Sequence, residues 1–103
     1  HAHYGLGLTQ RKVRRSAAAE MSFRQAIRLQ SDFFEALVNL AKVLLEQRRP
    51  EEAIEPIRKA LGMRPQDRSA RLLLGSALAS SGRESPAKVV TSRAQASALF
   101  LGA

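Results

Sequence analysis

The sequence repeats itself at an interval of 34 residues, and this periodicity constrains the fold more than any other feature. Six columns keep that interval: Ala2, Ala36 and Ala70; Leu6, Leu40 and Leu74; Gly7, Ala41 and Gly75; Arg15, Arg49 and Arg83; Ala19, Ala53 and Ala87; and Ala26, Ala60 and Ala94. Three copies fit without insertion or deletion, over residues 1–33, 34–67 and 68–103. A period of this length is typical of stacked supersecondary units, none of which buries its apolar face alone. The sequence therefore predicts a single domain over residues 1–103 that binds rather than catalyses.

Within each copy the apolar residues have the spacing of amphipathic helices. In the second copy Leu37, Leu40 and Leu44 recur at intervals of three and four residues. A second helix is predicted from Pro50, because proline is favoured at a first helical position, to just before Pro65. No stretch has the two-residue alternation of a strand, so the chain is predicted to be all-α.

The copies carry the motif of a known family, in which Leu-Gly is followed by Ala-x₃-Phe and then by Pro. The matching residues are Leu6-Gly7, Ala19 and Phe23, then Leu40-Ala41, Ala53, Ile57 and Pro65, then Leu74-Gly75 and Ala87. The chain resembles the tetratricopeptide repeat family over nearly its whole length. That resemblance implies a right-handed superhelical α-solenoid of three antiparallel helix pairs, six helices in all. Gln10, Ser31 and Thr91 depart from the pattern, and Thr91 stands where a large apolar residue is usual.

The ends of the chain suggest a piece of a longer, bacterial-type protein of this family. The sequence starts at His1, almost at the first predicted helix, and residues 98–103 form an apolar end without a polar cap. We expect that end to continue into more chain or to be covered by a partner or by self-association. No apolar run is long enough to span a bilayer, and no signal peptide opens the chain, so a cytoplasmic location is expected.

Catalytic chemistry has little support in the sequence. His1 and His3 lie two residues apart, so a helix would point them in different directions. Gly5 and Gly7 lack the third glycine of a phosphate-binding loop and follow no strand. The segment 80–82 (Ser-Ser-Gly) is predicted to be a turn that ends a helix, with no base to activate a serine. There is no cysteine. We therefore predict no enzyme activity and no catalytic, cofactor or metal site.

In the family the first helix of each unit lines a concave groove, and this resemblance assigns the candidate partner site. The predicted groove residues are Tyr4, Leu8, Arg11, Lys12, Val38, Asn39, Lys42, Leu72 and Leu73. The anchors are predicted to be Leu72, Leu73, Val38 and Tyr4, with polar support from Asn39 and Lys42. Exposed apolar residues on a concave face often mark an interaction surface. The expected partner is a segment of another protein, either extended or helical.

One subclass of the family holds the C-terminal carboxylate of chaperone tails with lysine, asparagine and arginine side chains. The matching positions here are Tyr4, Leu8, Asn39, Ser69 and Leu73. Only Asn39 agrees, and without cationic donors a buried carboxylate would lack its charge-assisted hydrogen bonds. The sequence therefore does not favour a chaperone tail as partner.

The charge is strongly basic, with 17 Lys and Arg against 9 acidic residues and a formal net charge of +8. Arginines gather at the predicted turns between paired helices, and this basic ridge comprises Arg14, Arg15, Arg48, Arg49 and Arg83. Solubility and cations at helix C-termini give one explanation. The alternative is an acidic partner surface, or nucleic acid bound at most non-specifically, because no aromatic residue is interleaved for base stacking.

Two functional classes stay open at this point. The first is a non-catalytic protein–protein interaction scaffold, which the repeat pattern favours. The second is an appendage of a larger enzyme, such as a glycosyltransferase or a sulfotransferase, that positions a protein substrate. The reading frame on either side of His1 and Ala103 would separate these two classes.

Overall fold

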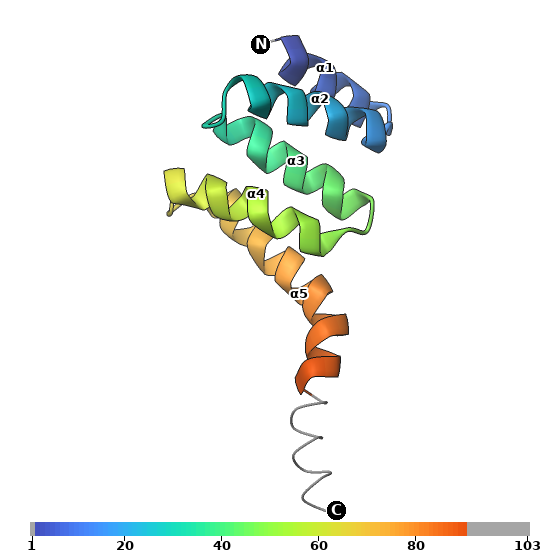
Figure 1. The fold of residues 1–103 in the computed structure, drawn as a ribbon, viewed down its shortest axis with the longest axis vertical. Helices are drawn as coiled ribbons and strands as arrows, with labels where there is room; N and C mark the ends of the chain where they lie inside the picture. The colour runs from blue at the N-terminus through green and yellow to red at the C-terminus, as the bar shows by residue number, and fades with distance from the viewer. Residues whose placement is uncertain (1, 91–103) are drawn as a thin grey trace, which may run out of the picture.

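The computed structural model describes the backbone of residues 2–90 and the side chains of residues 2–81. Within the described backbone the chain forms five helices and no strand. They are α1 (Ala2–Lys12), α2 (Ser16–Leu29), α3 (Phe34–Glu46), α4 (Pro50–Met63) and α5 (Arg68–Val90). Figure 1 shows α1 to α4 as a zigzag in which each helix runs against the previous one. The predicted all-α solenoid is confirmed.

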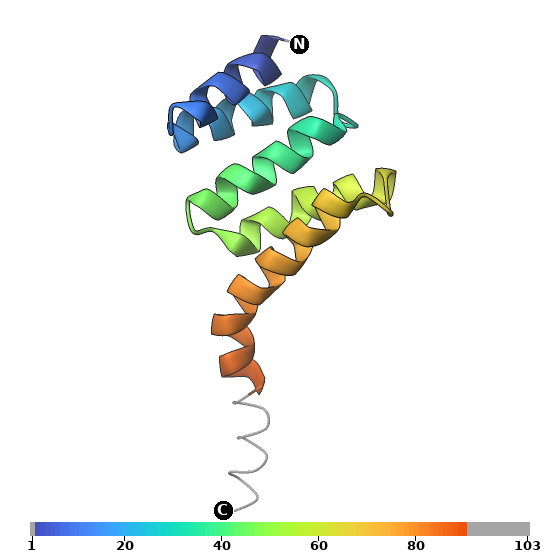
Figure 2. The same cartoon turned by 180° about the vertical axis from the view of Figure 1, so that it is seen from behind.

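Each helix packs mainly against its neighbours in the sequence, and α3 is the one described helix that contacts all of the others, α1, α2, α4 and α5. Figure 2 shows α3 between α2 and α4 from behind. This position explains why the buried residues of α3 surround most of its circumference, for example Ala36, Leu37 and Leu40. The largest fully buried side chains are Phe23, Leu37, Leu44, Ile57 and Val43. The core is therefore centred on the helices of the middle of the stack.

The turns after α1 and α3 have the same backbone geometry. Arg14 and Arg48 have φ angles of 63° and 61°, in the left-handed region. The amide of Arg15 donates to the carbonyl of Gln10 at 2.8 Å, and the amide of Arg14 to that of Arg11 at 3.0 Å. The amides of residues 48 and 49 repeat this pattern on the carbonyls of residues 45 and 44, at 3.0 and 2.9 Å. Both turns are thus Schellman motifs, which satisfy the last carbonyls of a helix.

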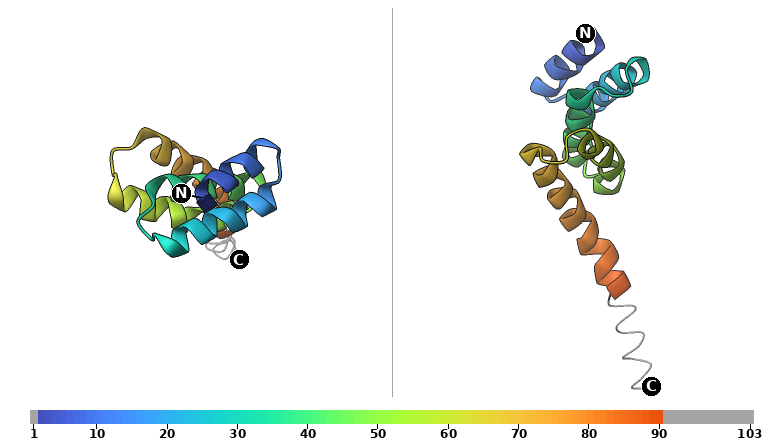
Figure 3. Two further views of the ribbon diagram at one scale, coloured as in Figure 1. Left: turned by 90° about the horizontal axis from the view of Figure 1, so that it is seen from above. Right: turned by 90° about the vertical axis from the view of Figure 1, so that its left-hand side faces the viewer.

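The third unit differs from the prediction. The turn expected at residues 80–82 is absent, because α5 continues unbroken from Arg68 to Val90. Figure 3 shows α5 as one long helix that leads away from the stack. The sequence offers a reason: folding back would bring Thr91 to the position that Phe23 and Ile57 occupy in the first two units, so little apolar area would be buried. The predicted sixth helix and the apolar end at 98–103 lie outside the described residues.

Candidate functional site

The first helices of the units, α1, α3 and α5, are neighbours and together form one surface. Leu8, Lys42 and Ser76 occupy equivalent positions at the 34-residue interval, so they face the same side of their helices. We call this surface the first-helix face. Its exposed or half-buried members from the predicted groove are Tyr4, Leu8, Arg11, Lys12, Lys42, Leu72 and Leu73. Leu72 is the most open of these apolar side chains, with 65% of its surface exposed.

Two of the predicted anchors belong wholly or partly to the core. Val38 is only 7% exposed and lies in a cluster with Phe34, Ala60 and Ala70. Leu73 is half-buried and packs against the same cluster from α5. The placement of Val38 as an exposed anchor is therefore wrong, because the packing of α5 onto α3 and α4 covers it. Leu8 and Leu72 are the apolar side chains that the first-helix face leaves open.

Tyr4 and Asn39 connect α1 to α3 across the first-helix face. The Nδ2 atom of Asn39 donates to the hydroxyl of Tyr4 at 3.2 Å and to the carbonyl of Glu35 at 2.9 Å. The Tyr4 ring lies 4.8 Å from the ring of Phe33 and 5.8 Å from that of Phe23, centroid to centroid. Burial, and then the charge of Glu35, raise the pKa of Tyr4. Tyr4 is thus a neutral, half-buried ring that Asn39 and the two phenylalanine rings hold in place.

A second connection between α1 and α3 lies at the other end of the face. The guanidinium of Arg11 pairs with the Glu46 carboxylate at 2.8 Å, and the Ser16 hydroxyl donates to the same carboxylate at 3.4 Å. These residues, with Lys12 and Arg14, line an open hollow of about 610 Å³. Among the described residues neither Lys12 nor Arg14 has an ion pair. The hollow therefore carries a net positive charge although Arg11 is neutralised.

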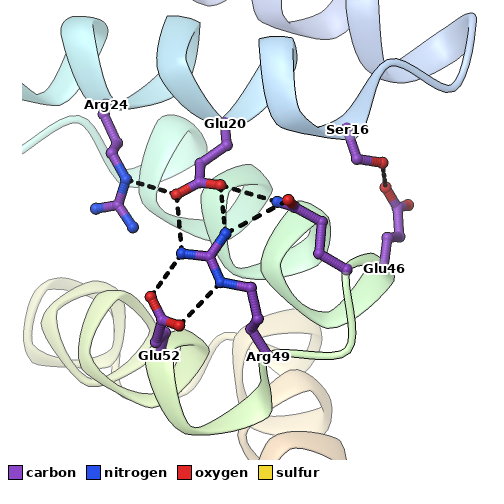
Figure 4. A network of polar contacts seen from close by, with 7 residues as sticks. Ser16, Glu20, Arg24, Glu46, Arg49 and Glu52 are labelled. Carbon is purple, nitrogen blue, oxygen red and sulfur yellow. Dashed lines mark hydrogen bonds and ion pairs between the residues drawn. The ribbon is translucent and has the colours of Figure 1, made fainter.

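Arg49 was predicted to be an exposed cation of the basic ridge, but it has a structural role instead. Its guanidinium pairs with Glu20 of α2 at 2.7 Å and with Glu52 of α4 at 2.6 Å. The Glu20 carboxylate also accepts hydrogen bonds from Gln47 and Arg24, both at 2.9 Å. Figure 4 shows these side chains converging from α2, from the turn after α3 and from α4. The charge of Arg49 is thus satisfied internally, and Arg49 is not available to a partner as a free cation.

The same network sets the ionisation of Glu20. Burial of its carboxylate alone would raise its pKa, but the hydrogen bonds from Arg49, Gln47 and Arg24 outweigh burial and lower the pKa from 4.5 to about 2. The hydrogen bond from Arg49 likewise lowers the pKa of Glu52. Both carboxylates stay charged at any physiological pH, so the network is a permanent clamp between the first two units.

What is left of the basic ridge is a smaller set of cations. Arg14, Arg15 and Arg48 are exposed at the two turns, which lie at the same edge of the stack in Figure 1. Arg83 does not lie at a turn, because it is within α5, and its side chain is outside the described ones. We call Lys12, Arg14 and Arg15, which are consecutive apart from Val13, the basic corner.

Sequence reasoning missed the acidic half of the network. Glu52 had a detectable signal, because an acid three residues after an arginine can pair with it at the start of a helix. Glu20 had none, since its contact with Arg49 spans 29 residues and depends on how α2 packs against α3 and the turn that follows α3. Such a pair becomes visible only once the stacking of the units is known.

The described residues contain no group of three or more His, Asp or Glu side chains placed to hold a metal ion. Over residues 2–90 no helix combines the length and the apolar character needed to cross a membrane.

Comparison with known proteins agrees with the geometry. A family model described as Tetratricopeptide repeat matches residues 4–68 and, in a second overlapping match, residues 44–85. The two matches together cover most of the chain, including α2, α3 and α4 and all but the first two residues of α1. A comparison with curated proteins found no match.

Proposed function

Because the chain belongs to the tetratricopeptide repeat family, we propose that it is a non-catalytic scaffold that binds a segment of another protein on the first-helix face. Proteins of this family generally mediate protein–protein interactions. The finer assignment, that the partner lies along α1, α3 and α5, is supported by the side chains that this face leaves open.

The observation that carries the proposal is the exposure of Leu8 on α1 and of Leu72 on α5, the first helices on either side of α3. Each lies beside polar groups that can fix a peptide, namely Lys12 next to Leu8 and Lys42 between the two leucines along the stack. Tyr4 adds an aromatic edge that is held in place by Asn39. Interface energy concentrates in a few such anchors, each of which costs about 2 kcal/mol or more on truncation.

The test begins with recovery of a partner by the full chain and measurement of its affinity for the purified chain by surface plasmon resonance. We expect Leu8→Ser and Leu72→Ser each to weaken binding about 30-fold, which corresponds to the loss of one such anchor. Met21→Ser is the matched control, because Met21 is equally apolar and 69% exposed but lies on α2. Helical circular dichroism should be unchanged in all three variants, since none of the three residues is buried.

Equal affinity for the wild type and both leucine variants would remove the first-helix face from consideration. Val38→Ser is not a suitable variant for this purpose. It places a hydroxyl in a buried cluster, so it would weaken binding through loss of stability.

A further inference from the structure

Among the described residues, nothing covers one side of α5 in the way that the equivalent side of the other first helices is covered. In α3 this side consists of Leu37, Ala41 and Leu44, all at most 2% exposed beneath the following helix, α4. The equivalent residues of α5 are Arg71, Gly75 and Leu78, which are exposed, Leu78 by 45%. We call these three residues the open α5 face. It is adjacent to the first-helix face but roughly a quarter turn around the helix from Leu72.

The first unit shows what kind of side chain fits this position. Gly7 of α1 is equivalent to Gly75, and the Phe23 ring of α2 lies directly on it. A Cβ atom on Gly7 would come within 2.6 Å of the Phe23 ring. Around Gly75 nothing among the described residues comes within 4 Å of such an atom. Over Gly75 there is therefore open space at the place where the Phe23 ring lies over Gly7, and no described residue occupies it. We call this space the notch.

The chain itself supplies a poor match for the notch. Size is complementary in the first two units, with Phe23 opposite Gly7 and Ile57 opposite the larger Ala41. The residue in the same column of the third unit is Thr91, which is much smaller than phenylalanine and carries a hydroxyl. A helix with an aromatic residue would bury more apolar area over Gly75.

Charge further restricts the occupant. Arg68 and Arg71 are exposed on α5, and no acidic residue lies between Arg68 and Ser81. An occupant with carboxylates beside its apolar stripe would therefore be attracted to α5, and a basic one would be repelled.

From these observations we propose that the open α5 face binds an acidic amphipathic helix of another protein, which places an aromatic side chain over Gly75 as Phe23 is placed over Gly7. The α1–α2 interface is the template for this contact, with small residues on either side of the aromatic one. The open α5 face is a second binding surface, separate from the first-helix face. Its proposal does not depend on the partner segment proposed for the first-helix face.

The probe is a helix-stapled peptide with the sequence of residues 16–29, in which Arg24→Glu and Arg28→Glu supply the acidic character. Its matched control carries Phe23→Ala in addition. Fluorescence anisotropy with the full chain should show binding of the aromatic peptide, and the alanine peptide should bind at least tenfold more weakly. Equal affinity of the two peptides would overturn the proposal, since it would show that no ring enters the notch.

Variants of the full chain locate the site. Gly75→Leu fills the notch and should weaken the aromatic peptide at least tenfold, whereas Gly75→Ala should have a smaller effect in the same direction. Leu29→Ser, an exposed apolar position on α2, should leave the affinity unchanged. Circular dichroism verifies that each variant is folded. An unchanged affinity in Gly75→Leu would contradict the proposal.

A photo-cross-linker distinguishes a peptide on the open α5 face from the two other possible occupants, the C-terminal residues of the same chain and a second copy of the chain. With p-benzoylphenylalanine at position 78, the labelled peptide should be captured on irradiation. If the chain without peptide instead cross-links to its own C-terminal residues or to a second copy, the face is already occupied and the proposal fails.

Discussion

At the scale of single residues, alanine substitutions at Gly7 and Gly75 measure how closely a following helix packs on α1 and on α5. Gly7→Ala forces the added methyl group against the buried Phe23 ring, so we expect a loss of about 1–3 kcal/mol in the free energy of unfolding. Gly75→Ala meets open space within the described structure and should stabilise the helix by roughly 0.5–1 kcal/mol. Urea denaturation followed by circular dichroism measures both. A neutral Gly7→Ala would show that α1 and α2 separate more easily than the packing of Phe23 indicates.

Glu20 determines part of the acid response at this same scale. Its pKa is 4.5 as a free group and about 2 in the folded chain, so its contribution is complete above pH 4.5 and is lost as the pH falls toward 2. Glu20→Gln should lower the free energy of unfolding by about 1–3 kcal/mol at pH 6, because Arg49 loses a charged partner. Between pH 4.5 and 2 the variant should lose less stability than the wild type. Glu55→Gln, an exposed carboxylate on α4, is the control; identical acid profiles for Glu20→Gln and the wild type would exclude the mechanism.

At the scale of elements, each Schellman turn holds an arginine in the left-handed backbone region, which lowers the stability of the fold relative to a glycine there. A residue with a Cβ atom in the left-handed region is disfavoured by about 1–2 kcal/mol, and Arg48 lies there with a φ of 61°. Arg48→Gly should therefore raise the free energy of unfolding by about 1 kcal/mol. Gln25→Gly, at an exposed position inside α2, should lower it by a similar amount, because glycine weakens a helix interior. Thermal denaturation compares the two, and a destabilising Arg48→Gly would show that the side chain makes an unrecognised contact.

The elements also show how much the sequence determines. The 34-residue columns predicted α1 to α4 because the apolar columns, such as that of Ala19 and Ala53, recur in neighbouring units that pack into one core. They failed for α5, because a column states which residues are equivalent but not whether the chain turns at residues 80–82 or continues as a helix. The site was predicted less well. Leu8 and Leu72 are open as expected, but Val38 is covered by α5, and the burial of a residue under a distant helix has no local signal.

At the scale of the whole molecule, charge is distributed unevenly between the units. Residues 1–33 carry six basic and two acidic side chains, whereas residues 34–67 carry six of each. The middle unit uses its acids to neutralise cations, as Glu46 does for Arg11 and Glu52 for Arg49. The excess at the first unit is therefore concentrated at the basic corner, next to Leu8 on the first-helix face. This position would draw an acidic partner segment toward the proposed site.

The basic corner should then control the rate of association rather than the stability of the fold. Reversal of Lys12, Arg14 and Arg15 to glutamate should slow association with the partner about tenfold at low salt and flatten its salt dependence, since attraction over more than about 10 Å is screened at 0.1 M. The control reverses Arg28, Arg58 and Lys59, which are exposed on α2 and α4 and change the net charge by the same amount. Stopped-flow association across a salt series compares the two triple variants. If both slow association equally, overall charge attracts the partner and the corner has no special role. If only the corner variant slows it, the arginines that precede α2 are part of the approach to the first-helix face.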